Sequence, residues 1–163
     1  MGLFWLCCAA VLLLARDVDG LIVVSMAPWP AHNPTHSAVC SAVDTSTDHE
    51  VGSCCLEAVP MTSDGEVQSY GGRLRPLLTG LIVEPPYRRC GVGRTLMRDA
   101  ERHVLSWGYG ELLLHVQSRN VQAMAFYRSC GYEPALDVTP PEESFLSWLG
   151  GGSLILLRKR LRT

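Results

Sequence analysis

The residues best suited to chemistry in this sequence lie between positions 81 and 96, which read L-I-V-E-P-P-Y-R-R-C-G-V-G-R-T-L. The apolar start, the two prolines and the two glycines predict a strand, a tight loop and a helix in succession. Such a loop aims backbone N–H groups at an anion, and the helix dipole adds to the attraction. Arg88, Arg89 and Arg94 contribute side-chain charge suited to phosphate. We therefore expect a phosphorylated ligand at this loop.

Two familiar phosphate-binding loops do not fit this segment. No Gly-Lys-Ser/Thr follows it, as a P-loop requires, and Leu96 stands where the dinucleotide-binding fingerprint has its third glycine. The spacing that remains is Arg88-x-x-Gly91-x-Gly93. By itself this spacing is compatible with any tight turn between a strand and a helix, so the rest of the chain has to decide its meaning.

A second pattern follows one helix and one strand later. Residues 120–132 read N-V-Q-A-M-A-F-Y-R-S-C-G-Y, in which Asn120 is placed to cap a short helix and Gly131 to end it. This stretch resembles the N-x-x-A-x-x-φ-Y-x-x-x-G-F/Y signature of the GCN5-related N-acetyltransferases (GNAT). The earlier V-x-P-x-Y-R-x-x-G-x-G loop resembles the acetyl-CoA-binding motif of the same family. The resemblance covers residues 39–161, and the closing S-W-L-G-G-G-S-L-I-L-L-R-K-R-L resembles plant or algal plastid and cyanobacterial-type members.

The periodicity of the chain predicts an α/β (α+β) domain with a mixed, mostly antiparallel sheet and flanking helices. A short strand is expected at 21–26, and the order after residue 37 reads β-β-β-α-β-α-β-β. The expected strands are 37–43, 51–59, 77–83, 111–116, 132–138 and 154–161, and the expected helices are 93–107 and 120–131. On the first helix the apolar residues at helical spacing are Leu96, Ala100, Val104 and Trp107, and the other faces carry Arg98, Asp99, Glu101 and Arg102. The apolar residues of the second helix include Val121, Met124, Ala125 and Tyr127. The strands around residues 81 and 112 should be parallel neighbours, because a right-handed crossover joins them. The resemblance implies the acyl-CoA N-acyltransferase fold with an abbreviated N-terminal part.

The N-terminal segment, residues 1–36, is atypical, and we place the acetyltransferase domain at 37–163. Residues 3–15 form an apolar run too short to span a bilayer. The run is similar to the apolar region of a signal peptide but lacks the preceding positive charge, and a buried helix ended by Gly20 is the alternative. The family usually begins with a strand and two helices that form one wall of the acceptor site. Here that wall is expected to be shortened, replaced or missing from the gene model, and acceptor specificity depends on it.

Acetyl-CoA is the cosubstrate that the resemblance implies, without a metal. Backbone N–H groups of residues 89–94 would hold the pyrophosphate, supported by arginine side chains. The strand before the loop would bind the pantetheine arm, and one of its N–H groups could stabilise the oxyanion. The residues assigned to acetyl-CoA in this way are Leu81, Ile82, Val83, Arg88, Arg89, Cys90, Gly91, Val92, Gly93, Arg94, Thr95, Asn120 and Tyr127.

Acyl transfer to an amine also needs an acid and a base. Tyr127 is suited to protonate the leaving thiolate, since a phenol stays protonated at neutral pH; its alternative role is that of a core aromatic residue. Glu57, Glu84 and His115 are the candidates for the base, with an ordered water in place of a dedicated side chain as the alternative. Glu84 could also be a solvated residue at a strand end, and His115 a buried one.

The resemblance therefore implies an N-acetyltransferase that transfers an acetyl group from acetyl-CoA to a primary amine: a protein N-terminus, a lysine or a small amine. A non-catalytic acyl-CoA-binding module of the same fold is the first alternative, and a nucleotide-binding protein unrelated to acyl transfer is the second. We expect no nucleic-acid or membrane partner, because the formal net charge of the 163-residue chain is only −2. An oligomer is compatible with the sequence.

Seven cysteines without a C-x-x-C pair indicate buried, reduced thiols rather than disulfides or a metal clamp. This composition favours a reducing intracellular compartment, cytoplasm or plastid. Cys90 lies inside the expected anion loop, where a thiol could either react or serve as a spacer. His32 and His36 have a metal-like spacing, but the neighbouring prolines favour a solvated loop.

Overall fold

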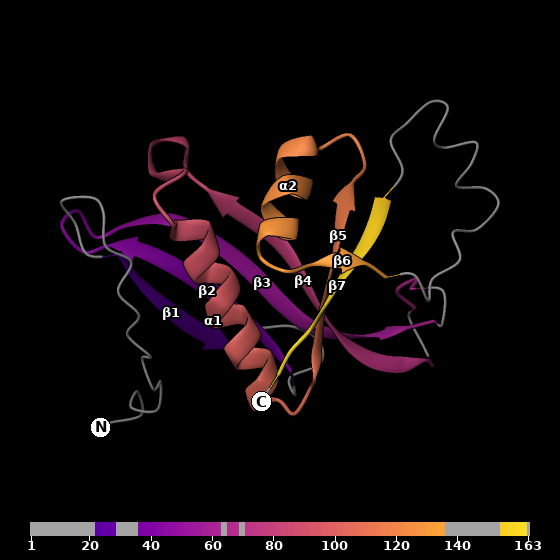
Figure 1. Ribbon diagram of the computed structural model, residues 1–163. Coiled ribbons are helices and arrows are strands. Elements are labelled where there is room, and N and C mark those ends of the chain that lie inside the picture. The colour runs from indigo at the N-terminus through magenta and orange to yellow at the C-terminus, as the bar shows by residue number, and fades with distance from the viewer. Residues whose placement is uncertain (1–21, 29–35, 63–64, 69–70, 136–153, 163) are drawn as a thin grey trace, which may run out of the picture. The chain divides into compact units, whose positions relative to one another are not determined.

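A computed structural model of the chain describes all residues except 1–21, 29–35, 63–64, 69–70, 136–153 and 163. The described residues contain a seven-stranded mixed sheet in the order β1-β2-β3-β4-β5-β7-β6 (Figure 1). The strands are β1 (Ile22–Pro28), β2 (Ser37–Asp44), β3 (His49–Met61), β4 (Arg73–Val83), β5 (Glu111–Gln117), β6 (Glu133–Pro134) and β7 (Leu154–Arg160). The helices are the 3₁₀ turn η1 (Pro85–Tyr87), α1 (Val92–Ser106) and α2 (Val121–Ser129).

The element order confirms the α/β prediction from residue 37 onwards. β4 and β5 are parallel, with Leu77 opposite Leu113 and Leu78 opposite Leu114, as the crossover rule required. The main difference is in the sixth strand, where the described strand comprises only Glu133 and Pro134. Residues 136–138 of the expected strand lie outside the described residues, as do the apolar run at 3–15, Gly20 and His32.

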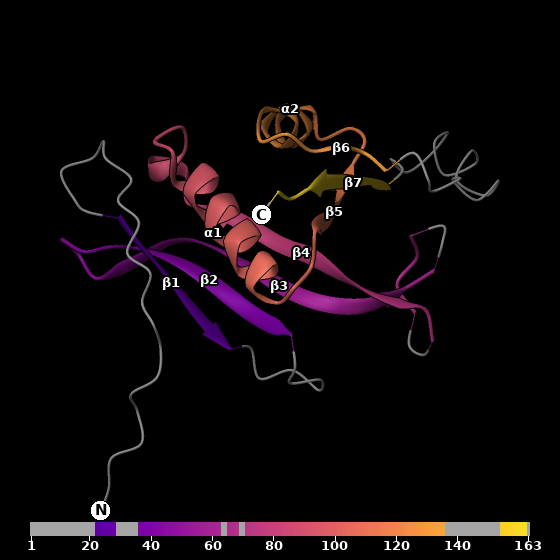
Figure 2. The ribbon, with the colours of Figure 1, turned by 60° about the horizontal axis from the view of Figure 1, so that its bottom comes forward.

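The chain divides into two compact units. The first comprises residues 1–55 and 80–99, and the second comprises residues 56–79 and 100–163. In the first unit β1 and β2 are antiparallel, from Ile22 opposite Asp44 to Pro28 opposite Ala38, and they lie side by side in Figure 2. Every second residue of β2 is buried from Ala38 to Asp44, which is the period of a strand with one face in a core.

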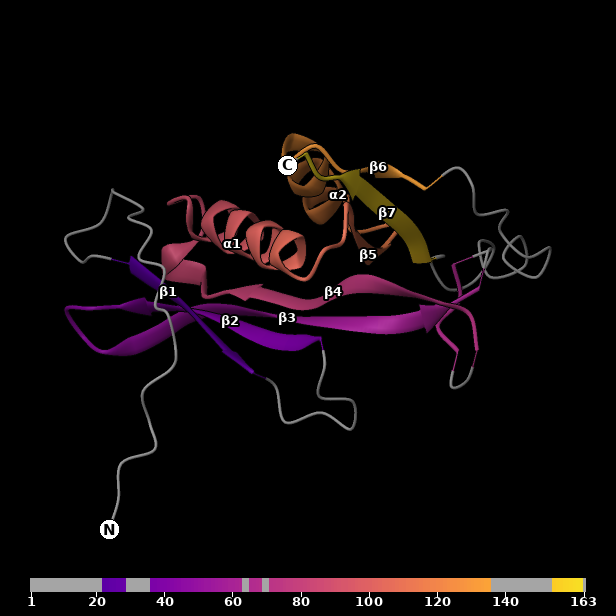
Figure 3. The same cartoon turned by 90° about the horizontal axis from the view of Figure 1, so that it is seen from below.

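The second unit has its own apolar core, in which β5 is a nearly continuous apolar run of the kind expected for a central strand. Its antiparallel partner is β7, from Glu111 opposite Arg160 to Gln117 opposite Leu154, and the two run side by side in Figure 3. The residues of the core cluster are Val59, Met61, Leu77, Leu113, Ala135 and Leu156. They come from β3, β4, β5, β7 and the position directly after β6, so the core ties together segments far apart in the chain.

The two helices bury a somewhat different set of side chains from the one that helical spacing indicated. On α1, Leu96, Ala100 and Val104 are buried as expected. Asp99, which helical spacing placed on the polar face, has only 6% of its surface exposed, and that expectation was wrong. On α2, Val121 is 73% exposed, so it does not contribute to the core as its apolar character suggested. Within the described part of the chain, none of the helices is long and apolar enough to cross a membrane.

Candidate functional site

The loop between β4 and α1 has the strand–loop–helix form that the sequence predicted. Pro85 and Pro86 have no N–H to continue a strand ladder, and the chain turns there into η1. The turn is closed by the N–H of Tyr87, which donates to the carbonyl of Glu84 at 3.0 Å. The Nε of Arg88 donates to the carbonyl of Val83 at 2.8 Å, so this arginine folds back on the strand end. The first half of the loop therefore has a defined shape.

The second half of the loop contains two residues in the left-handed region. Arg89 has φ 67° and Gly91 has φ 89°. A Cβ built on Gly91 would meet no atom within 4 Å, so the space around this residue is open. It is therefore the backbone angle, and not a lack of space, that favours glycine here. Left-handed residues in a turn point successive N–H groups into one concave surface, which is the form of an anion-binding nest. The backbone thus fits the phosphate role that the glycine spacing suggested.

Helix α1 begins directly after Gly91. The Thr95 N–H and Oγ1 both donate to the Gly91 carbonyl, at 3.0 and 3.3 Å. The Thr95 side chain is buried, and its hydroxyl is turned back to the loop. Arg94 is exposed in the first turn, where the positive end of the helix dipole also lies. The helix start combines fixed backbone dipoles with side-chain charge.

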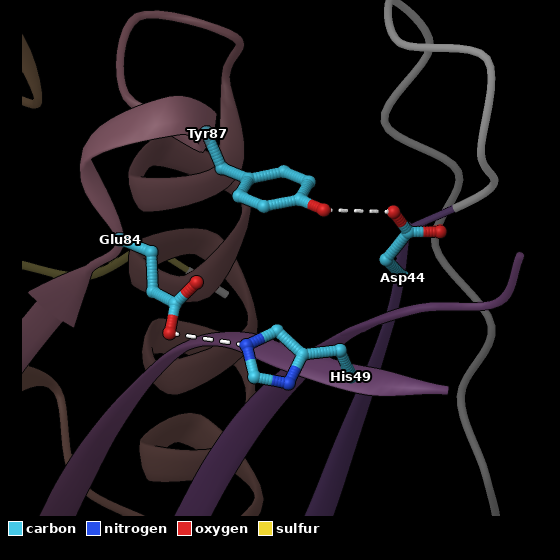
Figure 4. A network of polar contacts seen from close by, with 4 residues as sticks. All are labelled: Asp44, His49, Glu84 and Tyr87. Atoms are coloured by element: carbon cyan, nitrogen blue, oxygen red, sulfur yellow. Dashed lines mark hydrogen bonds and ion pairs between the residues drawn. The ribbon is translucent and has the colours of Figure 1, made fainter. Parts of the chain in front are cut away.

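Polar contacts attach this loop to the β2–β3 hairpin, two of which are drawn in Figure 4. The hydroxyl of Tyr87 donates to Oδ2 of Asp44 at 3.0 Å, and Nε2 of His49 lies 3.1 Å from Oε1 of Glu84. The N–H of Glu84 donates to the carbonyl of Val51 at 2.9 Å. The two side-chain pairs are 43 and 35 residues apart in sequence, so no local pattern could have linked them. Asp44 and His49 are the site residues that sequence reasoning missed.

Asp44 is held ionised by its surroundings. Hydrogen bonds from the hydroxyl and N–H of Ser46 and from Tyr87 hold the pKa of this carboxyl below its usual value. The same hydrogen bond to Asp44 raises the pKa of Tyr87, and partial burial and the nearby carboxylates are smaller causes. The pair is therefore a neutral phenol donating to a carboxylate at physiological pH.

Glu84 is less free to act as a base than the sequence suggested. Its carboxylate pairs with His49, and the side chains of His49 and Glu84 are 58% and 41% exposed. Glu57 is exposed on β3. His115 lies half-buried on β5, opposite Leu156, and burial lowers its pKa although the Glu66 carboxylate opposes this. Burial thus favours the neutral imidazole of His115, which is the form that accepts a proton.

Helix α2 places the residues of the second motif. Oδ1 of Asn120 accepts from the N–H of Ala123 at 3.0 Å, which confirms the predicted N-cap. Gly131 has φ 88° and ends the helix, also as predicted. Tyr127 is 9% exposed, and its ring makes edge contacts with Phe126 and Tyr132 at centroid distances of 5.4 and 6.2 Å. The geometry of Tyr127 alone is compatible with both a core role and a catalytic one.

The cysteines of the described residues are all free thiols. Cys40 and Cys54 are buried, and a hydrogen bond to Cys54, together with burial, raises the pKa of the Cys40 thiol. Cys90, half-buried in the loop, donates its S–H to the carbonyl of Arg88 at 3.5 Å. Over the part of the chain that the structure describes, no group of three or more His, Cys, Asp or Glu residues is arranged to hold a metal ion.

A family model for the acetyltransferase (GNAT) family matches residues 25–132. This chain belongs to the GNAT acetyltransferase family. The match includes both the loop at 81–96 and the segment at 120–132, and it begins inside β1, before the boundary at residue 37 that the sequence indicated. Among curated proteins, none matches this GNAT sequence significantly.

Solved structures of GNAT proteins share the fold. A Bacillus anthracis acetyltransferase assigned to streptothricin, in complex with acetyl coenzyme A, aligns with a TM-score of 0.59 and 17% identity, over 80% of this chain and 66% of that one. The Escherichia coli ribosomal-protein-S18-alanine N-acetyltransferase gives 0.53 and 19%, over 77% and 69%. Arabidopsis thaliana Naa50, in complex with the bisubstrate analogue CoA-Ac-MVNAL, gives 0.54 and 22%, over 76% and 72%. At these identities the likeness establishes the fold alone, and this chain spans just under two thirds of the B. anthracis protein.

Proposed function

We propose that this GNAT protein transfers an acetyl group from acetyl-CoA to a primary amine. The observation that carries the proposal is the loop at 84–94, where left-handed Arg89 and Gly91 are followed at once by the start of α1. That backbone form suits a pyrophosphate, and it lies inside the segment that matches an acetyltransferase family. The acceptor is a protein N-terminus, a lysine or a small amine.

The donor would be held mainly by backbone groups. We assign the pyrophosphate to the N–H groups of residues 89–94, with the exposed side chains of Arg89 and Arg94 adding charge. We assign the pantetheine arm to the β4 residues at 81–83, which lead directly into the loop. We propose that Asn120 also forms a hydrogen bond to the cofactor. Its Oδ1 accepts from the helix as the N-cap, and its amide nitrogen is a potential donor.

Acetyl-CoA supplies a thioester carbonyl that an amine attacks, so that a C–N bond forms and the C–S bond breaks. We propose that His115 takes the proton lost by the amine, because its lowered pKa leaves the imidazole neutral at pH 7. Glu84 is the weaker candidate, since it already pairs with His49 in an exposed position. Tyr127 would give its phenolic proton to the departing thiolate.

A thiol-release assay tests the proposal. The protein is incubated with acetyl-CoA and a panel of peptide N-termini, lysine peptides, polyamines and aminoglycosides, and free CoA thiol is followed with a thiol-reactive dye. The proposal expects release that depends on both protein and acceptor. Calorimetric binding of CoA without acceptor-dependent release across the panel would support the non-catalytic module instead. Stabilisation by ATP or NAD in preference to CoA would overturn both hypotheses.

A further inference from the structure

We propose that Tyr87 and Asp44 act as positioning residues that hold the loop at 84–91 in its donor-binding shape. This inference rests on the proposed function, because it assumes that the loop receives the CoA pyrophosphate. Tyr87 is the last residue of η1, and Asp44 is the last residue of β2. Their 3.0 Å hydrogen bond therefore joins the loop to a hairpin that carries none of the assigned donor-binding residues (Figure 4).

The carboxylate of Asp44 is itself fixed before it meets the tyrosine. Its Oδ1 accepts from the N–H of Ser46 at 2.9 Å and from the hydroxyl of Ser46 at 2.6 Å. Its Oδ2 accepts from Tyr87. Each oxygen thus has its own partner, and the turn that follows β2 determines where the second oxygen points. The hydroxyl of Tyr87 therefore donates to an acceptor whose orientation the hairpin already sets.

The loop needs an external attachment of this kind. None of the residues of η1 is buried, so the turn has no apolar core of its own. Arg89 adopts φ 67°, a conformation that costs free energy for a residue with a side chain and persists only where the surroundings enforce it. Of the exposed arginines around it, Arg88 is bonded back to the carbonyl of Val83 at the strand end rather than to Arg89. Contacts from outside the loop add to the restraint that keeps its N–H groups aligned.

Of the side-chain contacts to the hairpin that Figure 4 draws, the bond between Tyr87 and Asp44 is the one placed to be strong. Asp44 is only 6% exposed, and hydrogen bonds to a charged group with little access to water are worth more than neutral ones. The pair of His49 and Glu84 is exposed on both sides, and such pairs contribute little. A further contact, from the N–H of Glu84 to the carbonyl of Val51, is a backbone bond directly after β4, at the start of the loop.

The consequence is specific to one part of the donor. A preorganised set of N–H groups strengthens binding by reducing the ordering that the ligand must impose. Losing the attachment should weaken the grip on the pyrophosphate and leave the steps at the thioester unchanged. The binding and turnover of a donor that lacks the pyrophosphate should therefore not change.

The test compares the Tyr87→Phe variant with the wild type. The substitution removes one oxygen and keeps the ring, so the fold should persist, and a thermal melt verifies this. We expect the Kd for CoA and the KM for acetyl-CoA to rise on the order of tenfold, with kcat unchanged. With S-acetylpantetheine as donor, kcat/KM should equal that of the wild type. Tyr109→Phe, the same chemical change in the segment after α1, is the matched control and should leave both donors unaffected.

Asp44→Asn provides a second variant, because the amide oxygen can still accept while the charge is lost. It should give an intermediate rise in the KM for acetyl-CoA, and the Asp44→Asn, Tyr87→Phe double variant should be no worse than Tyr87→Phe alone. Equal losses with acetyl-CoA and S-acetylpantetheine would show a general structural role and overturn the inference. An unchanged affinity of Tyr87→Phe for CoA would also overturn the inference. In that case the proposed function would still stand, provided that the wild type binds CoA. Failure of the wild type to bind CoA would overturn both.

Discussion

Gly52 on β3 lies directly against the carbonyl of Ile82 on β4. A Cβ built on Gly52 would stand 2.8 Å from that oxygen and 3.4 Å from the Cα of Val83. Only a residue without a side chain allows this approach of the strand that precedes the anion loop.

Gly52→Ala should therefore displace the end of β4. Because the closest atom belongs to the backbone, relief requires the strand to shift, and we expect a loss of about 1–3 kcal/mol in the free energy of unfolding. Chemical denaturation measures this loss, and the affinity for CoA should fall with it. An alanine variant with wild-type stability and CoA affinity would show that β4 tolerates the shift without consequence for the loop.

Gly91→Ala separates backbone strain from steric conflict. The position has φ 89° and open space around it, so the added methyl group strains the backbone without a clash. We expect a cost of about 1–3 kcal/mol, met partly by a change in loop shape and therefore by weaker CoA binding. Gly110→Ala is the control, because that glycine also has open space but no positive φ. Similar CoA affinities in the two variants would argue against the nest as the donor grip.

Asn120→Ala should destabilise the protein by about 1 kcal/mol, since the N–H of Ala123 loses its capping acceptor. Asn120→Asp keeps an acceptor and adds a charge that the helix dipole favours, so its stability should match that of the wild type. Urea unfolding of the three proteins measures the effect. If Asn120→Asp binds acetyl-CoA less well at full stability, the amide nitrogen has a role beyond the cap.

The pH dependence of stability should carry the signature of half-buried histidines. Burial lowers the pKa of both His103 and His115 below the usual value of 6.5. Between the folded and unfolded pKa values the unfolded chain binds more protons, so the free energy of unfolding rises with pH in this range. The contribution of these histidines to stability is therefore lost as the pH falls below about 6.5. Denaturation midpoints between about pH 5 and 7.5 measure the slope. His115→Gln should flatten it, and an unchanged slope would mean that His115 does not contribute.

Tyr127→Phe tests the proton donor. The ring packing against Phe126 and Tyr132 survives the change, so this part of the stability should be retained. If the phenol protonates the thiolate, kcat should fall by about 10²-fold or more with little change in KM. A variant that retains wild-type kcat would leave Tyr127 with its packing role alone.

Features with a local cause were accessible from the sequence. The glycine spacing before α1, the Asn120 cap and the Gly131 terminus depend on backbone conformations that only certain residue types adopt readily, and all three are present in the structure. The alternation of β2 and the apolar run of β5 likewise report which faces a strand buries. Periodicity and turn chemistry act over a few residues, and this is the range that a single sequence reveals.

The tertiary structure decided everything that depends on chain segments meeting over long separations. It joined Asp44 to Tyr87 across 43 residues and His49 to Glu84 across 35, and neither residue of the hairpin had a local pattern to mark it. It buried Asp99, which helical spacing alone placed on the polar face of α1. Hydrogen bonds of this kind depend on where the packed strands bring their ends. The sequence thus determined the shape of the anion loop, whereas the packing of a distant hairpin against it determined what holds that shape.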